Sequence, residues 1–150
     1  MMVSDSDAAL RLHATCVGWD EGAVLLIGDS GCGKSDLALR LIKEGAFLVA
    51  DDQVELRRED EVLLASPPDS LAGLLEVRGL GILEVGHQEP ARLVAAIELV
   101  EEEERMPDPA EIDFLGVTLP LYRLSPWPVS AAAKVRLAVE LATGSIMPAS

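Results

Sequence analysis

Eight consecutive residues in the first quarter of the chain have the types and the spacing that bind phosphate groups. The pattern G-x-x-x-x-G-K-[ST] is matched at each position by Gly28, Asp29, Ser30, Gly31, Cys32, Gly33, Lys34 and Ser35. Glycines let backbone N–H groups converge on phosphate oxygens without a side chain in the way. Lys34 would place its charge on the β- and γ-phosphates, and the hydroxyl of Ser35 would ligate Mg²⁺. The pattern therefore predicts a nucleotide site that uses Mg²⁺.

Two adjacent carboxylates, Asp51 and Asp52, follow an apolar run further along the chain. In a parallel α/β sheet the carboxyl ends of neighbouring strands meet at the ligand crevice, so both acids are expected to face the phosphates. One carboxylate can hold Mg²⁺, and the other can accept the proton of an attacking hydroxyl. The alternative is a solvated strand end at which both acids form a turn. The neighbouring phosphate loop favours the catalytic interpretation.

The elements around the loop follow from hydrophobic patterning. Residues 23–27 form a continuous apolar run, as in a strand that is buried on both faces. Apolar residues then recur at helical spacing, which predicts a helix over 35–44 with Gly45 as its C-terminal cap. Residues 47–50 predict another buried strand. This β–loop–α–β order favours direct parallel pairing of the two strands through a right-handed crossover. The flanking strand and helix also argue against a merely flexible turn with an incidental lysine.

The rest of the chain reads mainly as strands joined by turns. Pro107 and Pro109 mark a loop, one last helix is predicted over 130–141, and the tail 143–150 is expected to fray. Further strands are predicted over 12–17, 53–58, 61–65, 80–85, 93–99 and 115–119. The sequence thus predicts one α/β domain over residues 1–150.

Composition and charge exclude several classes of function. The chain has 150 residues, with 12 basic and 26 acidic side chains, and a net charge of −14. Such a charge argues against binding to nucleic acid or to an anionic membrane surface. The two cysteines, Cys16 and Cys32, do not form a disulfide framework, which favours the reducing cytoplasm. Residues 1–10 lack the features of a secretory signal, and no apolar run is long enough to span a membrane.

Three segments together resemble one family. The phosphate loop, the run Leu48-Val49-Ala50-Asp51-Asp52 and the string Leu75-Glu76-Val77-Arg78-Gly79-Leu80-Gly81-Ile82 are similar to the catalytic domain of bacterial HPr kinase/phosphorylase. The resemblance covers about residues 11–142, and the third string is its most specific part. It implies an α/β P-loop kinase domain of the phosphoenolpyruvate carboxykinase type, with a mixed sheet and a phosphate-loop helix.

The resemblance also implies an activity and a set of site residues. The family uses ATP and Mg²⁺ to phosphorylate a serine of HPr, the small phosphocarrier of the sugar phosphotransferase system. Residues 76–85 match a segment that serves both phosphorylation and its reversal. By resemblance, Lys34 and Ser35 hold phosphate and metal, Asp51 and Glu76 support the metal, Asp52 accepts the proton of the serine, and His13 and Arg105 complete the catalytic site.

This chain departs from the family pattern in three respects. It starts just before the catalytic core, so the usual N-terminal domain is expected to be absent. Residues 128–134 lack the glycine–arginine pair that the family ties to phosphorylase activity, which argues against that activity. The terminal helices, which in the family help bind HPr and build hexamers, are expected to be mostly absent. The short form implies HPr or a nitrogen-related paralogue as the carrier, and a homo-oligomer of undetermined size.

Two other functions remain compatible with the phosphate loop besides a serine protein kinase: a small-molecule P-loop kinase, and a nucleotide-binding regulatory module with little turnover. Several residues also carry alternatives. Arg105 follows the acid run 101–104, which is expected to be solvated, so it either stabilises transferred phosphoryl charge or balances a surface loop. Arg78 either clamps phosphate or pairs with an acid. Trp127 is expected as a packing residue rather than a binding platform, and His87 is given no role.

Overall fold

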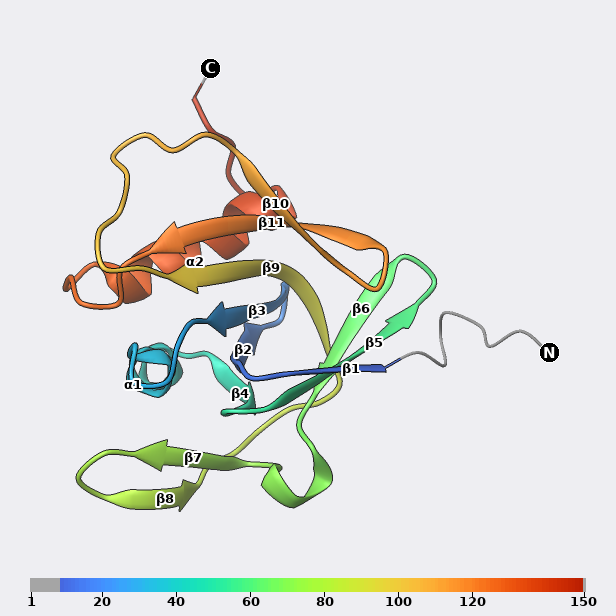
Figure 1. The fold of residues 1–150 in the computed structure, drawn as a ribbon, viewed down its shortest axis with the longest axis vertical. Coiled ribbons are helices and arrows are strands. Elements are labelled where there is room, and N and C mark those ends of the chain that lie inside the picture. The colour runs from blue at the N-terminus through green and yellow to red at the C-terminus, as the bar shows by residue number, and fades with distance from the viewer. Residues whose placement is uncertain (1–8, 150) are drawn as a thin grey trace.

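A computed structural model describes residues 9–149 of the chain. A curled, nine-stranded mixed sheet has two helices on one face, and a separate two-stranded hairpin lies beyond one end (Figure 1). The helices are α1 (Lys34–Lys43) and α2 (Ala131–Thr143). No helix within residues 9–149 is long and apolar enough to cross a membrane. Residues 1–8, which make up most of the segment expected to lack a secretory signal, lie outside the described residues. Residue 150 of the tail also lies outside them.

The large sheet follows the order β1-β5-β6-β9-β3-β2-β4, and β11 joins β9 with β10 on its outer side. Its strands are β1 (Ala9–Leu12), β2 (Thr15–Trp19), β3 (Gly22–Ile27), β4 (Phe47–Ala50), β5 (Val54–Glu59), β6 (Val62–Ser66), β9 (Ala91–Leu99), β10 (Ala110–Phe114) and β11 (Val117–Leu124). A short 3₁₀ helix, Asp69–Leu71, leads to the hairpin of β7 (Leu74–Val77) and β8 (Gly81–Glu84).

Strand β9 determines the curl of the sheet because it changes partner along its length. Residues 91–93 pair with antiparallel β6, whereas residues 96–99 pair with parallel β11. Parallel β3 pairs with the opposite edge of β9. Since β9 is buried along most of its nine residues, its sequence is nearly all apolar.

Along the central strands, successive side chains point to opposite faces of the sheet and pack into two hydrophobic cores. Val24 and Leu26 of β3 point to the face that α1 and α2 cover, where they pack with Leu37, Leu41 and Val135. Their neighbours Ala23 and Leu25 point to the other face. That face has no helix among its core residues. The curled sheet encloses it instead, with side chains from β5, β6, β10 and β11.

The expected mixed sheet with a phosphate-loop helix is confirmed, and both predicted helices form with shifted ends. The predicted direct pairing of 23–27 with 47–50 is wrong. Strand β2 lies between β3 and β4 and is antiparallel to both. The β–α–β pattern could not show this, because β2 comes before the unit in the sequence but lies between its two strands in the sheet.

Several smaller strand predictions also differ from the structure. The strand predicted over 115–119 is β11, whereas residues 115–116 form the turn of its hairpin with β10. Strands β1, β7 and β10 were not predicted. Each is only four or five residues long and partly exposed, so its apolar signal is weak. The tail does not begin to fray at 143, because α2 includes Thr143 and the amides of Ser145 and Ile146 bond to the carbonyl of Glu140.

Candidate active site

The phosphate loop connects the end of β3 to the start of α1. Gly31 and Gly33 have φ angles of 83° and 100°, a region that L side chains rarely adopt, so glycine is required at both turns. The amide of Cys32 donates to the carbonyl of Asp29 over 3.1 Å, which closes the loop. Among the described residues, no side chain caps the helix at Gly33. The first amides of α1 therefore remain available to an anion.

Lys34 crosses the loop from the first position of α1. Its ammonium donates to the carbonyl oxygens of Gly28, over 2.7 Å, and Asp29, over 3.0 Å. The residue is only 7% exposed, so its charge acts in a region with little screening by water. Cys32 packs against the helix-side core, in line with its expected role as a small filler.

Asp51 is a buried carboxylate that joins three elements. One oxygen, Oδ1, accepts hydrogen bonds from the hydroxyls of Thr15, over 2.9 Å, and Ser35, over 2.8 Å. The other, Oδ2, accepts the amide N–H of Glu76 over 3.2 Å. The residue is 7% exposed. Asp51 therefore ties β2, the phosphate-loop helix and β7 together, and fixes the orientation of the Ser35 hydroxyl.

Asp52 has the opposite character, because its side chain is exposed and reaches into solvent. Its φ of 69° places the backbone in the left-handed region, which aspartate tolerates better than most residues. This turn directs the carboxylate away from that of Asp51. Oδ1 of Asp52 lies 2.6 Å from Nε2 of His13. The same segment of chain also bonds through its backbone, since Ala14 donates to the carbonyl of Asp52 over 3.1 Å.

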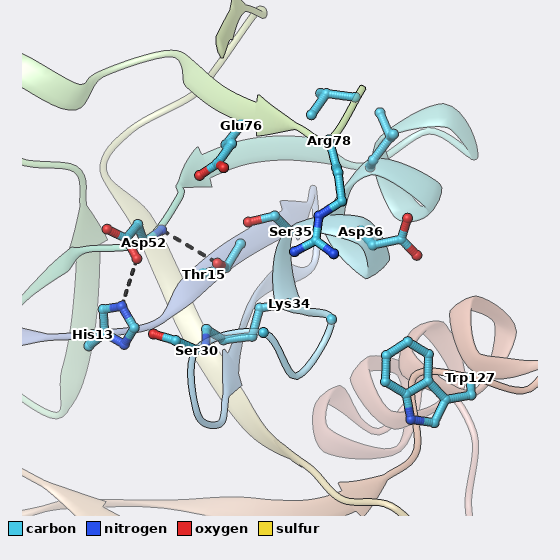
Figure 2. A pocket seen from close by; sticks show the side chains of 14 residues that line it. His13, Thr15, Ser30, Lys34, Ser35, Asp36, Asp52, Glu76, Arg78 and Trp127 are labelled. Carbon is cyan, nitrogen blue, oxygen red and sulfur yellow. Dashed lines mark hydrogen bonds and ion pairs between the residues drawn. The ribbon is translucent and has the colours of Figure 1, made fainter. Parts of the chain in front are cut away.

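These groups face one cavity of about 520 Å³ (Figure 2). Lys34 and Ser35 lie near its middle, with His13 and Asp52 on one side of them and Trp127 on the other. The hairpin contributes Glu76 and Arg78, and the guanidinium group of Arg78 reaches down into the cavity. The residues that line the cavity are His13, Thr15, Ser30, Gly31, Gly33, Lys34, Ser35, Asp36, Leu39, Asp52, Glu76, Val77, Arg78 and Trp127.

The structure thus brings together most of the residues that the sequence singled out. Gly28, Asp29 and Cys32 belong to the loop without lining the cavity, and Asp51 lies behind it. Arg105 is the exception. It is exposed in the segment between β9 and β10 and is not among the residues that line the cavity.

Sequence reasoning missed Thr15 and misjudged Trp127. Thr15 reaches Asp51 only because β2 pairs with β4, a long-range contact that leaves no motif. Trp127 was expected as a packing residue, but it is 57% exposed and lines the cavity. Its position between two prolines was the available signal, because proline lacks a backbone donor and keeps this segment outside the helices and strands.

Part of the acid run 101–104 is structural, contrary to expectation. Glu103 accepts the amide N–H of Ser125 over 3.1 Å and pairs with Lys134 over 2.6 Å. The Lys134 ammonium beside Glu103 holds the pKa of that carboxyl below its ordinary value. Through Glu103, the run therefore stabilises the segment before α2 and is not simply a solvated charged loop.

The donor atoms at the cavity suit Mg²⁺ that arrives with a phosphate ligand. Within residues 9–149, no three His, Cys, Asp or Glu side chains form a closed metal cluster. Mg²⁺ is ordinarily held by one or two protein oxygens, substrate phosphates and water, so such a cluster is not required. The Ser35 hydroxyl donates a hydrogen bond to Asp51, which leaves its oxygen lone pairs open to a metal ion. Glu76 carries an exposed carboxylate on the cavity.

A mixed sheet that presents a phosphate loop, with one acid behind it and another across the cavity, is the arrangement of a P-loop kinase-like fold. The chain belongs to the HPr Serine kinase C-terminal domain family, whose pattern it matches over residues 7–143. The family inferred from the three motifs is thereby confirmed.

Known relatives agree with this assignment. The solved structure of the Hpr(Ser) kinase/phosphatase from Coxiella burnetii matches with a TM-score of 0.72 and 28% identity, over 86% of this chain and 95% of that chain. The HPr kinase/phosphorylase of Bacillus cytotoxicus is 60% identical over 63 residues, 41% of this chain and 20% of the relative. That of Clostridium botulinum (strain Eklund 17B / Type B) is 39% identical over 110 residues, 71% of this chain. The chain covers only 20% and 36% of the lengths of these two relatives.

Proposed function

We propose that residues 1–150 form one catalytic domain, which transfers phosphate from ATP to a serine of an HPr-type phosphocarrier. One observation carries this proposal. An exposed carboxylate, Asp52, faces the same cavity as the phosphate loop and is oriented by His13. A domain that only bound nucleotide would need the loop but not this pair. The family membership and the names of the relatives support the same acceptor class.

The phosphate end of the site follows from the loop. The open amides at the start of α1 and the ammonium of Lys34 would hold the phosphates. Ser35 and Glu76 would hold Mg²⁺, which would supply positive charge at the reacting phosphates. Asp51 would act on the metal indirectly by orienting Ser35, because three donors already occupy its oxygens. Asp51 would therefore support the metal by positioning the Ser35 hydroxyl and not as a direct ligand.

The acceptor end depends on Asp52. A general base must be exposed enough to meet an incoming hydroxyl and fixed enough to meet it at hydrogen-bond distance. The carboxylate of Asp52 is 63% exposed, and its bond to His13 restricts its orientation. Asp52 would take the proton of the serine as the hydroxyl oxygen attacks. In phosphoryl transfer the remaining rate acceleration comes from position and charge rather than covalent chemistry.

The hairpin β7–β8 is the part of the site best suited to meet a protein acceptor. Leu80 and Ile82 are 73% and 70% exposed, on the hairpin that also carries Arg78. Exposed apolar side chains beside a catalytic cavity are typical of a protein-binding surface. We propose this hairpin as the docking surface for the carrier. The free thiols of Cys16 and Cys32 suit the reducing cytoplasm, where such a carrier works.

Three expectations stay predictions. A role for Arg105 in phosphate transfer would require its segment to approach the cavity. The expected homo-oligomer would be tested by analytical ultracentrifugation. The expected loss of phosphorylase activity would be tested by incubating the protein with the phosphorylated carrier.

Phosphate transfer itself tests the proposed function. The protein would be mixed with ATP, Mg²⁺ and each HPr-type carrier of its own organism, and every carrier would be weighed by mass spectrometry. We expect one phosphate on a serine of one carrier, and none with the Lys34→Ala variant. No phosphate on any carrier, while ATP still binds, would overturn the kinase proposal.

A further inference from the structure

An aromatic ring lies at the end of the cavity that the proposed chemistry leaves unused. Trp127 is 57% exposed and lines the cavity together with the phosphate loop. Figure 2 shows His13 and Asp52 on one side of Lys34 and the indole of Trp127 on the other. A partly exposed indole inside a cavity presents a flat apolar face that a ligand in the cavity can cover.

The ring adjoins the loop closely. Atom Cη2 of the Trp127 indole would be 3.5 Å from a Cβ built on Gly33, and the ring of Pro126 would be 3.3 Å from the same point. A nucleotide whose terminal phosphate lies on the Asp52 side of Lys34 must extend its ribose and base toward the opposite side. Trp127 is the aromatic side chain that lines this opposite side among the described residues.

The segment that carries the ring is held in place by three elements. The guanidinium of Arg40 in α1 donates to the carbonyl of Pro126. The amide N–H of Trp127 donates to the hydroxyl of Ser125 over 3.4 Å. The amide N–H of Ser125 donates to the carboxylate of Glu103. Lys134 of α2 donates to the same carboxylate. These contacts hold the backbone that carries the ring, so less conformational entropy is lost when a ligand binds.

We propose that Trp127 is the platform on which the adenine base of ATP stacks, so that the indole sets where the nucleoside half of the substrate lies. This inference rests on the proposed function, because the direction of the nucleotide is taken from Asp52 as the proton acceptor. Stacking of a base on an aromatic side chain is a recurrent mode of nucleotide recognition, with Trp and Phe both able to serve.

Two ligands separate base stacking from phosphate binding: ATP, and inorganic tripolyphosphate as a ligand without a base. Calorimetry would measure the Kd of each for the native chain and for Trp127→Leu and Trp127→Phe. We expect Trp127→Leu to weaken ATP binding about tenfold, from the usual strength of one base–aromatic stack. It should leave the Kd of tripolyphosphate unchanged, and Trp127→Phe should restore most of the affinity for ATP.

Fluorescence gives a second readout on the same contact. In a Trp19→Phe background the emission comes from Trp127 alone, because the chain has two tryptophans. The guanidinium carbon of Arg136 lies 5.1 Å from the ring centre of Trp19, and Trp19 does not line this cavity. ATP should quench the remaining emission, and tripolyphosphate should not.

The outcomes distinguish the two proposals. Unchanged ATP affinity in Trp127→Leu, or equal losses for ATP and tripolyphosphate, would overturn the stacking inference alone. Selective loss of ATP affinity without phosphate transfer to any carrier would support stacking and overturn the kinase proposal. If the native chain bound neither ligand, both proposals would fall together.

Discussion

Nε2 of His13 lies 2.6 Å from Oδ1 of Asp52, although the two residues are 39 positions apart in the chain. The contact forms because the segment before β2 runs beside the end of β4, where Ala14 bonds to the carbonyl of Asp52. The imidazole therefore limits how the carboxylate can turn, while the carboxylate stays open to the cavity. This pair is the feature on which the proposed transfer chemistry depends most.

Replacing Asp52 should separate transfer from binding. Asp52→Asn keeps the shape of the side chain and tolerates the positive φ, but asparagine cannot accept the proton of an attacking hydroxyl. We expect transfer to fall by about 10²- to 10⁴-fold, with ATP affinity unchanged. Asp60→Asn is the matched control, since Asp60 has a φ of 54° in the turn between β5 and β6. Equal loss in both variants would contradict the role of Asp52.

His13 should act through Asp52 rather than independently. His13→Gln should slow transfer about tenfold, and the same change should cost nothing further in an Asp52→Asn background, because coupled residues are not additive. His87→Gln controls for loss of an imidazole at the other histidine, which pairs with Glu89 instead. Additive effects of His13→Gln and Asp52→Asn on the transfer rate would show that the two residues work separately.

Asp51 should contribute to stability as well as to the site. An asparagine there would turn an NH₂ group toward one of the three donors that Asp51 now accepts. A buried polar group left without a partner costs about 1–3 kcal/mol, so Asp51→Asn should lower the free energy of unfolding by that amount. Urea denaturation would measure it. Exposed Glu76→Gln should leave stability unchanged, and the proposed arrangement fails if both variants are equally stable.

The Glu103–Lys134 pair should give the loop before α2 a dependence on acid. Because the folded-state pKa of Glu103 lies below its unfolded value, the pair contributes stability above that unfolded value, about 4.3. The contribution is lost as the pH falls through the folded pKa. Glu103→Gln should therefore be less stable than the native chain at pH 7, by about 1 kcal/mol, and this difference should shrink as the pH falls below about 4.3.

Urea titrations at several pH values would follow that difference. Glu102→Gln removes a charge from the same segment at an exposed position and should show no such convergence. A native chain whose advantage over Glu103→Gln does not shrink as the pH falls below about 4.3 would rule out the ion pair as its source.

The two thiols should differ in reactivity. Burial raises the pKa of the Cys16 thiol, so it stays protonated and inert, whereas Cys32 is only partly buried within the phosphate loop. Iodoacetamide should alkylate Cys32 about tenfold or more faster than Cys16 in the folded protein, as read by peptide mass spectrometry. ATP with Mg²⁺ should protect Cys32. Labelling of Cys16 at an equal rate, or no protection, would contradict this arrangement.

Local patterns were sufficient for the elements next to the phosphate loop. The apolar run of β3, the loop glycines and the helical spacing of α1 are consecutive in the chain, so their signals do not depend on distant contacts. The same patterns failed for short strands. Strands β7 and β10 are stabilised by one hairpin partner each in register, and their few residues resemble turns until that partner is present.

The sequence by itself determined which chemical groups this protein has for phosphate and for an acid-assisted transfer. The loop from Gly28 to Ser35 and the adjacent acids after β4 are defined by residue type and spacing, which one stretch of chain can supply. Their division of labour was decided only by the tertiary structure. Insertion of β2 beside β4 brings Thr15 to Asp51 and His13 to Asp52. One acid is thereby buried and saturated with donors while its neighbour stays exposed, because burial and hydrogen bonding depend on strands that pair across the fold.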